Sequence, residues 1–342
     1  MVCNPQSILD RPKLAEDPLT DVLDLLHVER AVSATLEARG AWALRFPAYA
    51  HVKFAALLAG DCWLLHDALA APLRLRAGDA YLLADGVPYV LASDPALEAV
   101  DATPYFERAA VEGGAARCGG EGEGEATVVR GGGFAFDPRN AELLLDALPP
   151  LVVMRAEDPA APRAAAVVRA AVELLSAERA APALGSELMA ERLADVLFVQ
   201  ALRIVAASGA GKTADGGAHG ARTPEAPVRR GWVSALGDPQ IGAALRLMHG
   251  DLARRWTVAE LAGTVGMSRS SFAERFRRRV GSAPLDYLLR WRMASAARAL
   301  EDPAVTVSSV AHALGYGSDS AFSNAFKRVM GSAPAHYRSG RA

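Results

Sequence analysis

The sequence predicts an α+β protein, with an N-terminal β-barrel followed by helices and then an all-α C-terminal domain. In the first part, short apolar runs alternate with Gly, Asp and Pro, as in "HVKFAALLAGDCWLLHDALAAPLRLRAGDAYLL", which is typical of strands joined by tight turns. The C-terminal third instead carries two copies of a helical pattern. Between them, 206–230 is rich in Gly, Ala, Thr and Pro and holds few bulky apolar residues. We therefore predict domains at 1–205 and 231–342, joined by a flexible linker at 206–230.

Length and composition are typical of a soluble globular chain. Its 342 residues suffice for two domains, and 51% hydrophobic and 22% charged residues are ordinary values. The sequence has no apolar run of about eighteen residues, and its N-terminus lacks the charged and apolar regions of a signal peptide. We therefore expect a cytoplasmic protein with no membrane partner. Three cysteines, Cys3, Cys62 and Cys118, are too few for a disulfide framework or a four-ligand zinc site.

Charge divides the chain more sharply than its net value of -2 suggests. The segment 231–342 holds 15 Lys and Arg against 8 Asp and Glu, whereas the first 230 residues hold 22 against 31. A basic domain suits a polyanionic partner, because each neutralised phosphate releases counterions. A solvated basic surface without such a partner is the alternative that charge alone leaves open.

Two helices are expected after the strands, at 162–178 and 186–207. The second carries a broad apolar stripe made of Leu188, Leu193, Val196, Leu197, Val199, Leu202 and Ile204. A stripe this wide can cover the helix's own domain and also meet a second subunit. Intramolecular packing alone and a homodimer are both compatible with it.

The C-terminal pattern is a repeat. "TVAELAGTVGMSRSSFAERFRRRVGSAPLDYL", which begins at Thr257, aligns with "TVSSVAHALGYGSDSAFSNAFKRVMGSAPAHY", which begins at Thr306. The offset is 49 and becomes 50 after one residue is inserted in the second turn. In the first copy, Thr257 and Glu260 form a capping-box signature, Gly266 ends a short helix, and Ser268 caps the next helix. Each copy is therefore predicted to be a helix-turn-helix.

The second helix of each copy places two phenylalanines four residues apart, which predicts that both are buried on one face. They are Phe272 and Phe276 in the first copy, and Phe322 and Phe326 in the second. The positions around the rest of each helix are polar or small, and these are the candidates for contact with a partner.

The tetrapeptide "GSAP" follows both of these helices, at 281–284 and 331–334. It predicts Gly as the stop of one helix, Ser as the cap of the next, and Pro in the first turn of that next helix. From Pro284, seventeen residues run without another Pro or any Gly, which predicts a stiff helix of roughly 25 Å at about 1.5 Å per residue. Such a spacer sets two probe helices about one DNA turn, roughly 34 Å, apart.

These motifs resemble the AraC/XylS family of bacterial transcription regulators. The resemblance rests on "WTVAELA", "MSRSSFAERF", "PLDYLLRWRM" and "VAHALGYGSDSAFSNAFKR", and it covers about 240–338 with both helix-turn-helix units in order. It implies sequence-specific binding to double-stranded DNA near promoters, usually as an effector-responsive activator, often as a dimer, and in contact with RNA polymerase. A tandem of short helices with a purely structural role is the alternative.

The chemistry of the outward residues suggests what they could do on DNA. Arg269 and Arg277 could contact phosphate or guanine. Ser270 and Ser320 could donate a hydrogen bond to phosphate or base, and Asn324 could pair bidentately with adenine. A solvated-surface role is the alternative for each of them.

By position, the resemblance implies base contacts in the first helix at Ser270, Ala273 and Glu274, and in the second at Ser320, Ser323 and Asn324. Lys327 completes the set of DNA-binding candidates on the second helix. Ala273 could contact only a thymine methyl group. Glu274 is repelled by phosphate, yet it can accept a hydrogen bond from cytosine N4.

The strand-rich part resembles a second known domain. "LRAGDAYLLADGVPY" is similar to the second conserved box of cupin barrels. "DPLTDVLDLL", "WALRFP" and "DALPPLVVMRAED" are similar to the cupin-type sensor domain that often precedes this DNA-binding module, over about 17–155. The resemblance implies a domain that senses a small-molecule effector.

A cupin also raises the alternative of a metal-dependent enzyme with an accessory DNA-binding domain. Cupin sites usually use a His-x-His pair with a carboxylate and a third His. Here Lys53 or Ala55 stands at a second-ligand position, and Tyr89 stands where a His is common. The histidines His27, His51 and His66 lack metal-ligand spacing. We therefore expect no metal, no cofactor and no catalysis.

The cysteines offer one more alternative, a redox-sensing regulator. Cys62 lies on a predicted strand and Cys118 in a loop rich in Gly and Glu, where oxidation could link or modify them. The acidic surroundings of Cys118 disfavour its thiolate. Buried or incidental cysteines are the competing interpretation.

Overall fold

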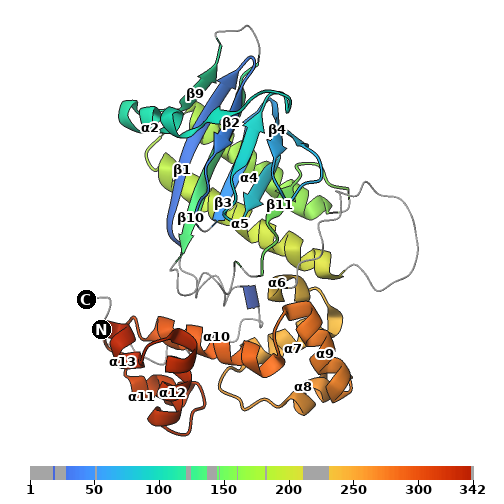
Figure 1. The fold of residues 1–342 in the computed structure, drawn as a ribbon, viewed down its shortest axis with the longest axis vertical. Helices are drawn as coiled ribbons and strands as arrows, with labels where there is room; N and C mark the ends of the chain where they lie inside the picture. Colours follow the sequence, from blue (N-terminus) through green and yellow to red (C-terminus); the bar gives the residue numbers. More distant parts are fainter. Residues whose placement is uncertain are drawn as a thin grey trace.

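The computed structural model describes residues 18–19, 28–50, 52–120, 125–136, 145, 147–159, 161–181, 183–210 and 231–339. The N-terminal part holds two β-sheets and a helical layer, and the C-terminal part is entirely helical (Figure 1). The α+β class predicted from the sequence is therefore confirmed. No helix in these ranges combines the length and the apolar character that crossing a lipid bilayer requires.

The larger sheet has six strands, which are antiparallel except for the last pair. In spatial order they are β11 (Leu151–Met154), β6 (Ala80–Leu83), β3 (Val52–Ala59), β10 (Thr127–Phe136), β1 (Val28–Arg39) and β9 (Ala116–Gly119). The smaller sheet has five strands, again with one parallel pair at an edge. Their order is β5 (Leu73–Arg76), β4 (Asp61–Leu65), β7 (Tyr89–Ala92), β2 (Ala43–Phe46) and β8 (Val100–Asp101). Helix α2 (Thr103–Glu112) connects β8 to β9.

The two sheets pack face to face over a shared core. Leu36 and Leu57 of the larger sheet meet Leu64 and Leu91 of the smaller sheet, and all four are at most 3% exposed. Both sheets are open: among the described residues, no backbone pairing joins the edge strands β11 and β9 of the larger sheet to the smaller sheet. The predicted closed barrel is therefore not confirmed, and two open sheets take its place.

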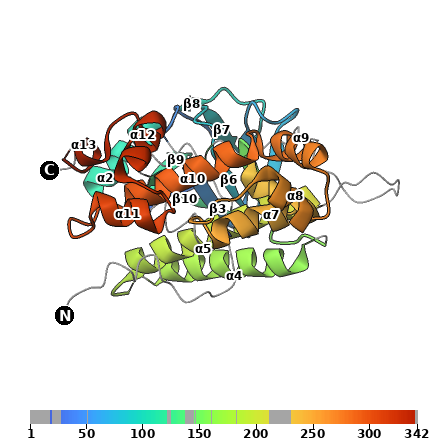
Figure 2. The same cartoon turned by 90° about the horizontal axis from the view of Figure 1, so that it is seen from below.

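Helices α4 (Pro162–Ala180) and α5 (Ser186–Ala210) cover the other face of the six-stranded sheet, which makes a third layer (Figure 2). Phe134 of β10 packs on Phe54 of β3 and on Phe198 of α5, with ring centroids 4.9 and 5.0 Å apart. Helix α5 runs to Ala210 and so passes the predicted start of the linker at 206, while 211–230 lie outside the described residues.

The apolar stripe predicted on α5 divides between two faces. Leu193, Leu197 and Leu202 are buried against the sheet, as a helix covering its own domain requires. Leu188 and Val196 instead point outward, with 56% and 39% of their surface exposed. The stripe therefore serves the domain's own core and also leaves apolar side chains uncovered.

The C-terminal domain consists of eight helices in the range 231–339. They are α6 (Trp232–Ala235), α7 (Pro239–Gly250), α8 (Val258–Thr264), α9 (Arg269–Val280), α10 (Pro284–Ala299), α11 (Val307–Ala313), α12 (Asp319–Met330) and α13 (Pro334–Ser339). Helix α10 runs between a group formed by α7, α8 and α9 and a group formed by α11, α12 and α13 (Figure 1).

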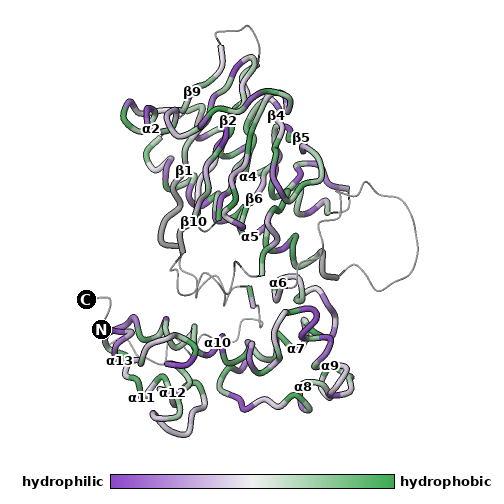
Figure 3. Tube along the Cα trace, viewed as in Figure 1, coloured by the Kyte–Doolittle hydropathy of each residue, from purple (hydrophilic) through white to green (hydrophobic). Residues whose placement is uncertain are grey.

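Two hydrophobic cores divide this domain unequally. The first begins at the six-stranded sheet, continues through α4 and α5 to α6, and ends among α7, α8, α9 and the first half of α10. The second is separate and joins the last half of α10 to α11, α12 and α13. Green, hydrophobic segments follow the strands and the inner helices in Figure 3. The N-terminal domain and the first helix-turn-helix unit therefore share one core.

Candidate nucleic-acid interface

The first helix-turn-helix unit consists of α8 and α9, and its ends are those the sequence predicts. The Thr257 hydroxyl accepts from Glu260 N–H at 3.1 Å, and the Glu260 carboxylate accepts from Thr257 N–H at 3.3 Å, which completes the capping box. Gly266 follows α8 in the left-handed conformation, with φ of 68°. The Ser268 hydroxyl caps α9 by accepting from Ser271 N–H at 3.2 Å.

The second unit, α11 and α12, repeats this local structure. Thr306 and Ser309 make a second capping box, and Gly315 ends α11 with φ of 75°. Ser318 caps α12 by accepting from Ala321 N–H at 3.2 Å. The inserted residue of the second turn is Gly317, which has no counterpart between Met267 and Ser268 of the first unit.

The second helix of each unit, α9 or α12, is held by the predicted pair of phenylalanines. Phe272, Phe276, Phe322 and Phe326 are all 0% exposed, and the rings of each pair lie 5.7 Å apart. Tyrosines from the following helices complete the packing: Tyr287 lies 5.8 Å from Phe276, and Tyr337 lies 5.4 Å from Phe326. The burial predicted from the four-residue spacing is confirmed.

The predicted DNA-facing residues lie mainly outside the buried face of each helix. On α9, Arg269, Ser270, Glu274 and Arg277 are exposed and Ala273 is half-buried. On α12, Ser320, Asn324 and Lys327 are exposed and Ser323 is half-buried. These equivalent positions of α9 and α12, fifty residues apart, therefore have the same degree of exposure. One extended ligand could contact both sets of side chains.

Two exposed arginines belong to the same surfaces and were not singled out from the sequence. Arg278 follows Glu274 by four positions, and its guanidinium lies 3.9 Å from the Glu274 carboxylate. Arg328 occupies the equivalent position on α12 and is also exposed. The signal that could have found them is the i,i+4 spacing from the base-contact candidates. The ion pair offsets part of the negative charge that makes Glu274 unusual in a DNA-facing position.

The spacer helix begins as predicted but with a different cap. Pro284 is the first residue of α10, so the N-cap position falls on Ala283, with φ -70° and ψ 151°, and no side chain caps the helix. The prediction that Ser282 of "GSAP" is the cap is wrong, because a proline at the first helical position makes the residue directly before it the cap and forces that residue to be extended. Gly281 is left-handed, with φ of 96°, and ends α9 as expected.

Helix α9 is anchored from behind by a buried carboxylate. Asp238 is 1% exposed and caps α7 by accepting from Gln240 and Ile241 N–H, both at 3.1 Å. Arg275 of α9 donates to Asp238 at 2.9 Å and to the Gln240 side chain at 2.7 Å, and Arg279 lies 3.3 Å from Asp238. Burial disfavours the charged carboxylate, but these N–H groups and the Arg275 guanidinium stabilise it more, so the pKa of Asp238 lies below its ordinary value.

An aromatic cluster behind α9 holds a neutral histidine. His249 of α7 is 7% exposed, and its Nε2 lies 2.8 Å from the Tyr287 hydroxyl. Trp291 and Trp232 pack on it, with ring centroids 4.8 and 6.3 Å away. Burial among these rings lowers the pKa of His249 to about 3.

Helix α6 brings this cluster into contact with the N-terminal domain. Gly231, just before α6, donates its N–H to the Arg279 carbonyl at 3.0 Å. A Cβ on Gly231 would lie 2.7 Å from the Cα of Ala147, in the N-terminal domain, so only glycine fits between the two. The end of α9 and the N-terminal domain therefore meet across a single residue.

The metal-ligand candidates of the N-terminal domain are dispersed. His66 is buried, its Nδ1 accepts from Ala68 N–H at 3.1 Å, and its Nε2 lies 3.3 Å from Asp85. Lys53 is half-buried, and desolvation lowers the pKa of its ammonium group. Over the ranges that the structure describes, no group of three or more His, Cys, Asp or Glu could hold a metal ion. His27 and His51 lie outside those ranges, so the expectation of no metal stays a prediction.

The two cysteines that the structure describes are both protonated thiols at neutral pH. Burial raises the pKa of Cys62, which is 1% exposed, to about 12, and the nearby Asp61 carboxylate adds to this. Burial also raises the pKa of Cys118, on β9, to about 11. Glu121 and Glu123 lie outside the described residues, so the effect predicted for the acidic neighbours of Cys118 stays a prediction. Neither thiol has the lowered pKa of a reactive cysteine.

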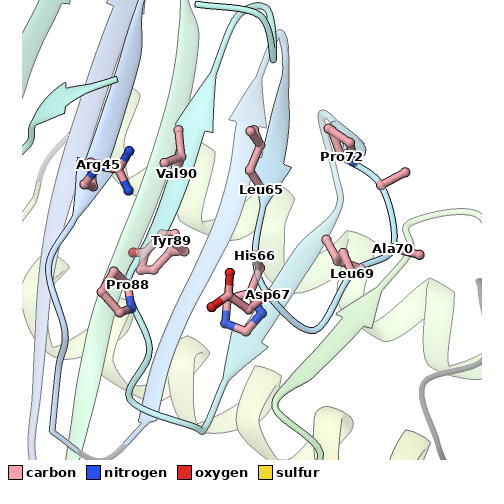
Figure 4. A pocket seen from close by; sticks show the side chains of 11 residues that line it. Arg45, Leu65, His66, Asp67, Leu69, Ala70, Pro72, Pro88, Tyr89 and Val90 are labelled. Carbon is pink, nitrogen blue, oxygen red and sulfur yellow. The ribbon is translucent and has the colours of Figure 1, made fainter. Parts of the chain in front are cut away.

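A shallow pocket of about 550 Å³ lies on the five-stranded sheet, at the ends of β4 and β7. Figure 4 shows Arg45 and Val90 on one side and the loop with Leu69 and Pro72 on the other. Its lining combines the polar side chains of Arg45, His66 and Asp67 with apolar ones such as Leu65, Leu69 and Val90.

Comparisons with known proteins agree with both halves of this architecture. Residues 17–207 match the family model described as Cupin, and residues 261–340 match the one described as Helix-turn-helix domain. Among solved structures, the DNA-binding domain of AdpA in complex with a target DNA is 36% identical and covers 30% of this chain and 92% of its own, with a TM-score of 0.28.

Relatives of full length are also similar. A protein of Streptomyces lividans, described as an AraC-like transcription regulator, is 43% identical over 94% of this chain and 98% of its own length. A protein of Streptomyces antibioticus with the same description is 40% identical over the same shares. AlkR of Acinetobacter baylyi, an HTH-type transcriptional regulator, is 27% identical over 94% of this chain and 99% of its own. The chain therefore belongs to the AraC-like family of DNA-binding transcription regulators.

Proposed function

We propose that this regulator reads one asymmetric DNA site of about 20 base pairs, with α9 and α12 in successive major grooves. The observation that carries the proposal is the pair of matched outward surfaces on two helices joined by α10, a single helix of 16 residues. A helix of that length spans roughly 24 Å, which with the helix diameters approaches one DNA turn. The two surfaces differ in sequence, so the two halves of the site differ as well.

The proposed contacts divide into two chemical classes. Base contacts come from Ser270, Ala273 and Glu274 on α9, and from Ser320, Ser323 and Asn324 on α12. Arg269, Arg277 and Lys327 hold phosphates, because their side chains are long, cationic and exposed. Arg278 neutralises Glu274 until a cytosine amino group replaces it as the partner.

Selection of genomic fragments with the full chain, followed by footprinting, tests the proposal. We expect one protected region of about 20 base pairs without inverted symmetry, and a log-log salt slope of several units if roughly 6 to 10 phosphates are contacted. Protection of only about 10 base pairs would mean that one unit alone enters the groove. Binding that does not depend on salt would contradict the phosphate contacts altogether.

Substitutions on α12 separate the two classes of contact. Asn324→Ala should weaken binding by about 1 to 3 kcal/mol at one base pair only, and specificity should relax at that position. Lys327→Ala, one turn further along the same face, should weaken all sequences alike and reduce the salt slope by about one. Competition binding with a panel of single-base variants measures both. Equal losses for every sequence with Asn324→Ala would contradict its role in reading a base.

We propose that the protein also forms a homodimer through the outer face of α4 and α5. The support is a set of exposed apolar side chains along both helices: Val167, Leu174, Leu188, Met189 and Val196, of which Leu174 and Leu188 are more than half exposed. An uncovered apolar surface of this kind marks an interaction site. Light scattering should give twice the chain mass for the full chain and the monomer mass for Leu174→Glu with Leu188→Glu. A monomeric wild-type chain would contradict the proposal.

The regulatory role follows from the family resemblance. We propose a cytoplasmic, effector-responsive activator that contacts RNA polymerase and carries no catalytic centre, with the pocket at Arg45 as the candidate effector site. Transcription in vitro with purified polymerase tests the direction of regulation. The competing hypothesis of a metal-dependent enzyme requires a stoichiometric transition metal in the purified protein, which elemental analysis detects.

A further inference from the structure

The two helix-turn-helix units meet at a seam between the loop 251–256, which precedes α8, and the turn 315–317 of the second unit. A Cβ on Gly315 would clash with the carbonyl oxygen of Ala253, so glycine is required there for space as well as for its φ of 75°. Arg292 of α10 fixes the same loop, because it donates to the carbonyl of Leu252 at 2.5 Å and to that of Arg254 at 2.6 Å. The loop is therefore held in a defined position between the two units.

Two neighbouring arginines of this loop have different environments. Arg254 lies 4.0 Å from the Trp256 ring centroid and pairs with Glu260 at 2.7 Å, so the fold of the first unit uses its charge. Arg255 is exposed, and within the described part of the chain it has neither an ion pair nor a hydrogen bond to its side chain. Its Nη2 lies 3.4 Å from the point that a Cβ on Gly317 would occupy. The inserted glycine of the second turn therefore leaves room for the Arg255 guanidinium.

The seam gathers positive charge. Arg292, half-buried below the loop, has a pKa lowered mainly by burial; Tyr316 and Asp251 act in the opposite sense, and the charge of Arg255 lowers the pKa further. Two guanidiniums that repel each other favour an anion beside them. Arg255 is the one of the two that solvent reaches freely, and the planar donors of an arginine match the oxygens of a phosphate.

We infer that Arg255 binds a backbone phosphate of the DNA segment that lies between the two grooves entered by α9 and α12. The inference rests on the proposed function, because two helices in successive major grooves leave that segment of backbone facing the seam. Such a contact carries no sequence preference of its own. It fixes the spacing of the two units on the duplex, since it holds the DNA at the point where both units meet.

The test compares the full-length wild type with Arg255→Ala and Arg255→Lys on the duplex recovered by selection. We expect Arg255→Ala to bind roughly tenfold more weakly and to reduce the salt slope by about one, and Arg255→Lys to restore the slope. Replacing the central phosphates of the duplex with neutral methylphosphonates should weaken wild-type binding and leave Arg255→Ala unaffected. Arg108→Ala, an exposed arginine on α2, is the matched control and should behave as wild type.

Two results separate the inference from the proposed function. An Arg255→Ala variant that keeps the wild-type salt slope and the sensitivity to central methylphosphonates would overturn the inference, provided that the wild type protects about 20 base pairs. A wild type that protects only about 10 base pairs would instead overturn the proposed function. Thermal unfolding of Arg255→Ala should match the wild type, because the side chain is exposed; a large loss of stability would show that Arg255 serves the fold and would overturn the inference.

Discussion

The two helix-turn-helix units have the same local structure, but the contacts behind their second helices differ. Both recognition helices have a serine cap, a buried pair of phenylalanines and a left-handed glycine at the end. Behind α9, however, Arg275 and Arg279 reach the buried Asp238. The equivalent positions of α12 are Ala325 and Val329, which pack in a small separate core. The back of α9 is therefore held by buried ion pairs and a large core, whereas the equivalent positions of α12 make apolar contacts.

This difference has a mechanical consequence for regulation. The core of the first unit continues through Trp232 and α5 to the six-stranded sheet, so a movement of α5 alters the packing behind α9 directly. Among the described residues, the core of the second unit includes no residue of the N-terminal domain, and this unit meets the first along α10 and at Gly315. An effector that shifts the N-terminal domain should act first on α9, because the packing between them is contiguous. We then expect the DNA contacts proposed for the second unit to change little when an effector binds.

The largest effect that can test this comparison comes from the phenylalanines. Phe276→Ala and Phe326→Ala, at equivalent positions, should each cost about 3 to 5 kcal/mol, because each removes a fully buried ring. Hydrogen exchange on the full chain should show lost protection in α6 and α5 with Phe276→Ala, but only in α10 to α13 with Phe326→Ala. DNA binding should fall in both. Equal changes in α5 and α6 for the two variants would show that the cores are coupled after all.

Removing the charge behind α9 should have a smaller effect. Asp238→Asn retains a side chain that can cap α7 but loses the ion pairs to Arg275 and Arg279, which we expect to cost about 1 to 3 kcal/mol. Since the pKa of Asp238 is lowered in the folded protein, this stabilisation is complete above about pH 4 and is lost only as the pH falls below that value. Denaturant unfolding should therefore give the same difference at pH 5.5 and pH 7.5. Asp286→Asn, an exposed residue at the start of α10, is the control and should change little.

The two units also show what the sequence could predict. The cap at Ser268 and the phenylalanine pairs were predicted correctly because caps and four-residue spacings are local signals. The link from Arg275 to Asp238 was missed because its partners are 37 residues apart, and no local pattern connects them. The cap was assigned to Ser282 instead of Ala283 because the sequence placed Pro284 in the first turn of the helix without showing that it is the first residue. In the N-terminal domain, the strands were predicted, but the two open sheets depend on which edges pair, and alternation along one strand cannot show this.

The smallest expected effect concerns His249, which only the first unit possesses. Its pKa is about 3 in the folded protein, against about 6.5 in an unfolded chain, so the unfolded state binds more protons as the pH falls below about 6.5. Stability should therefore fall on acidification, by about 1.4 kcal/mol for each pH unit below that value, and by roughly that amount at pH 5.5. Three aromatic side chains pack on His249, namely Tyr287, Trp232 and Trp291. None of the three carries a charge that could offset the cost of protonating His249.

The matched variant is His249→Gln, which keeps a hydrogen-bonding partner for the Tyr287 hydroxyl but cannot titrate. Its loss of stability between pH 7.5 and pH 5.5 should be smaller than that of the wild type by about 1 kcal/mol, although its stability at pH 7.5 should be lower because the aromatic packing is disturbed. The second unit has only exposed histidines, His312 and His336, so hydrogen exchange at pH 5.5 should show α7 and α9 opening before α12. Opening of α12 first would mean that acid acts on the protein through a group other than His249. The smaller core of the second unit, rather than protonation of the buried histidine, would then decide which of the two helices opens first.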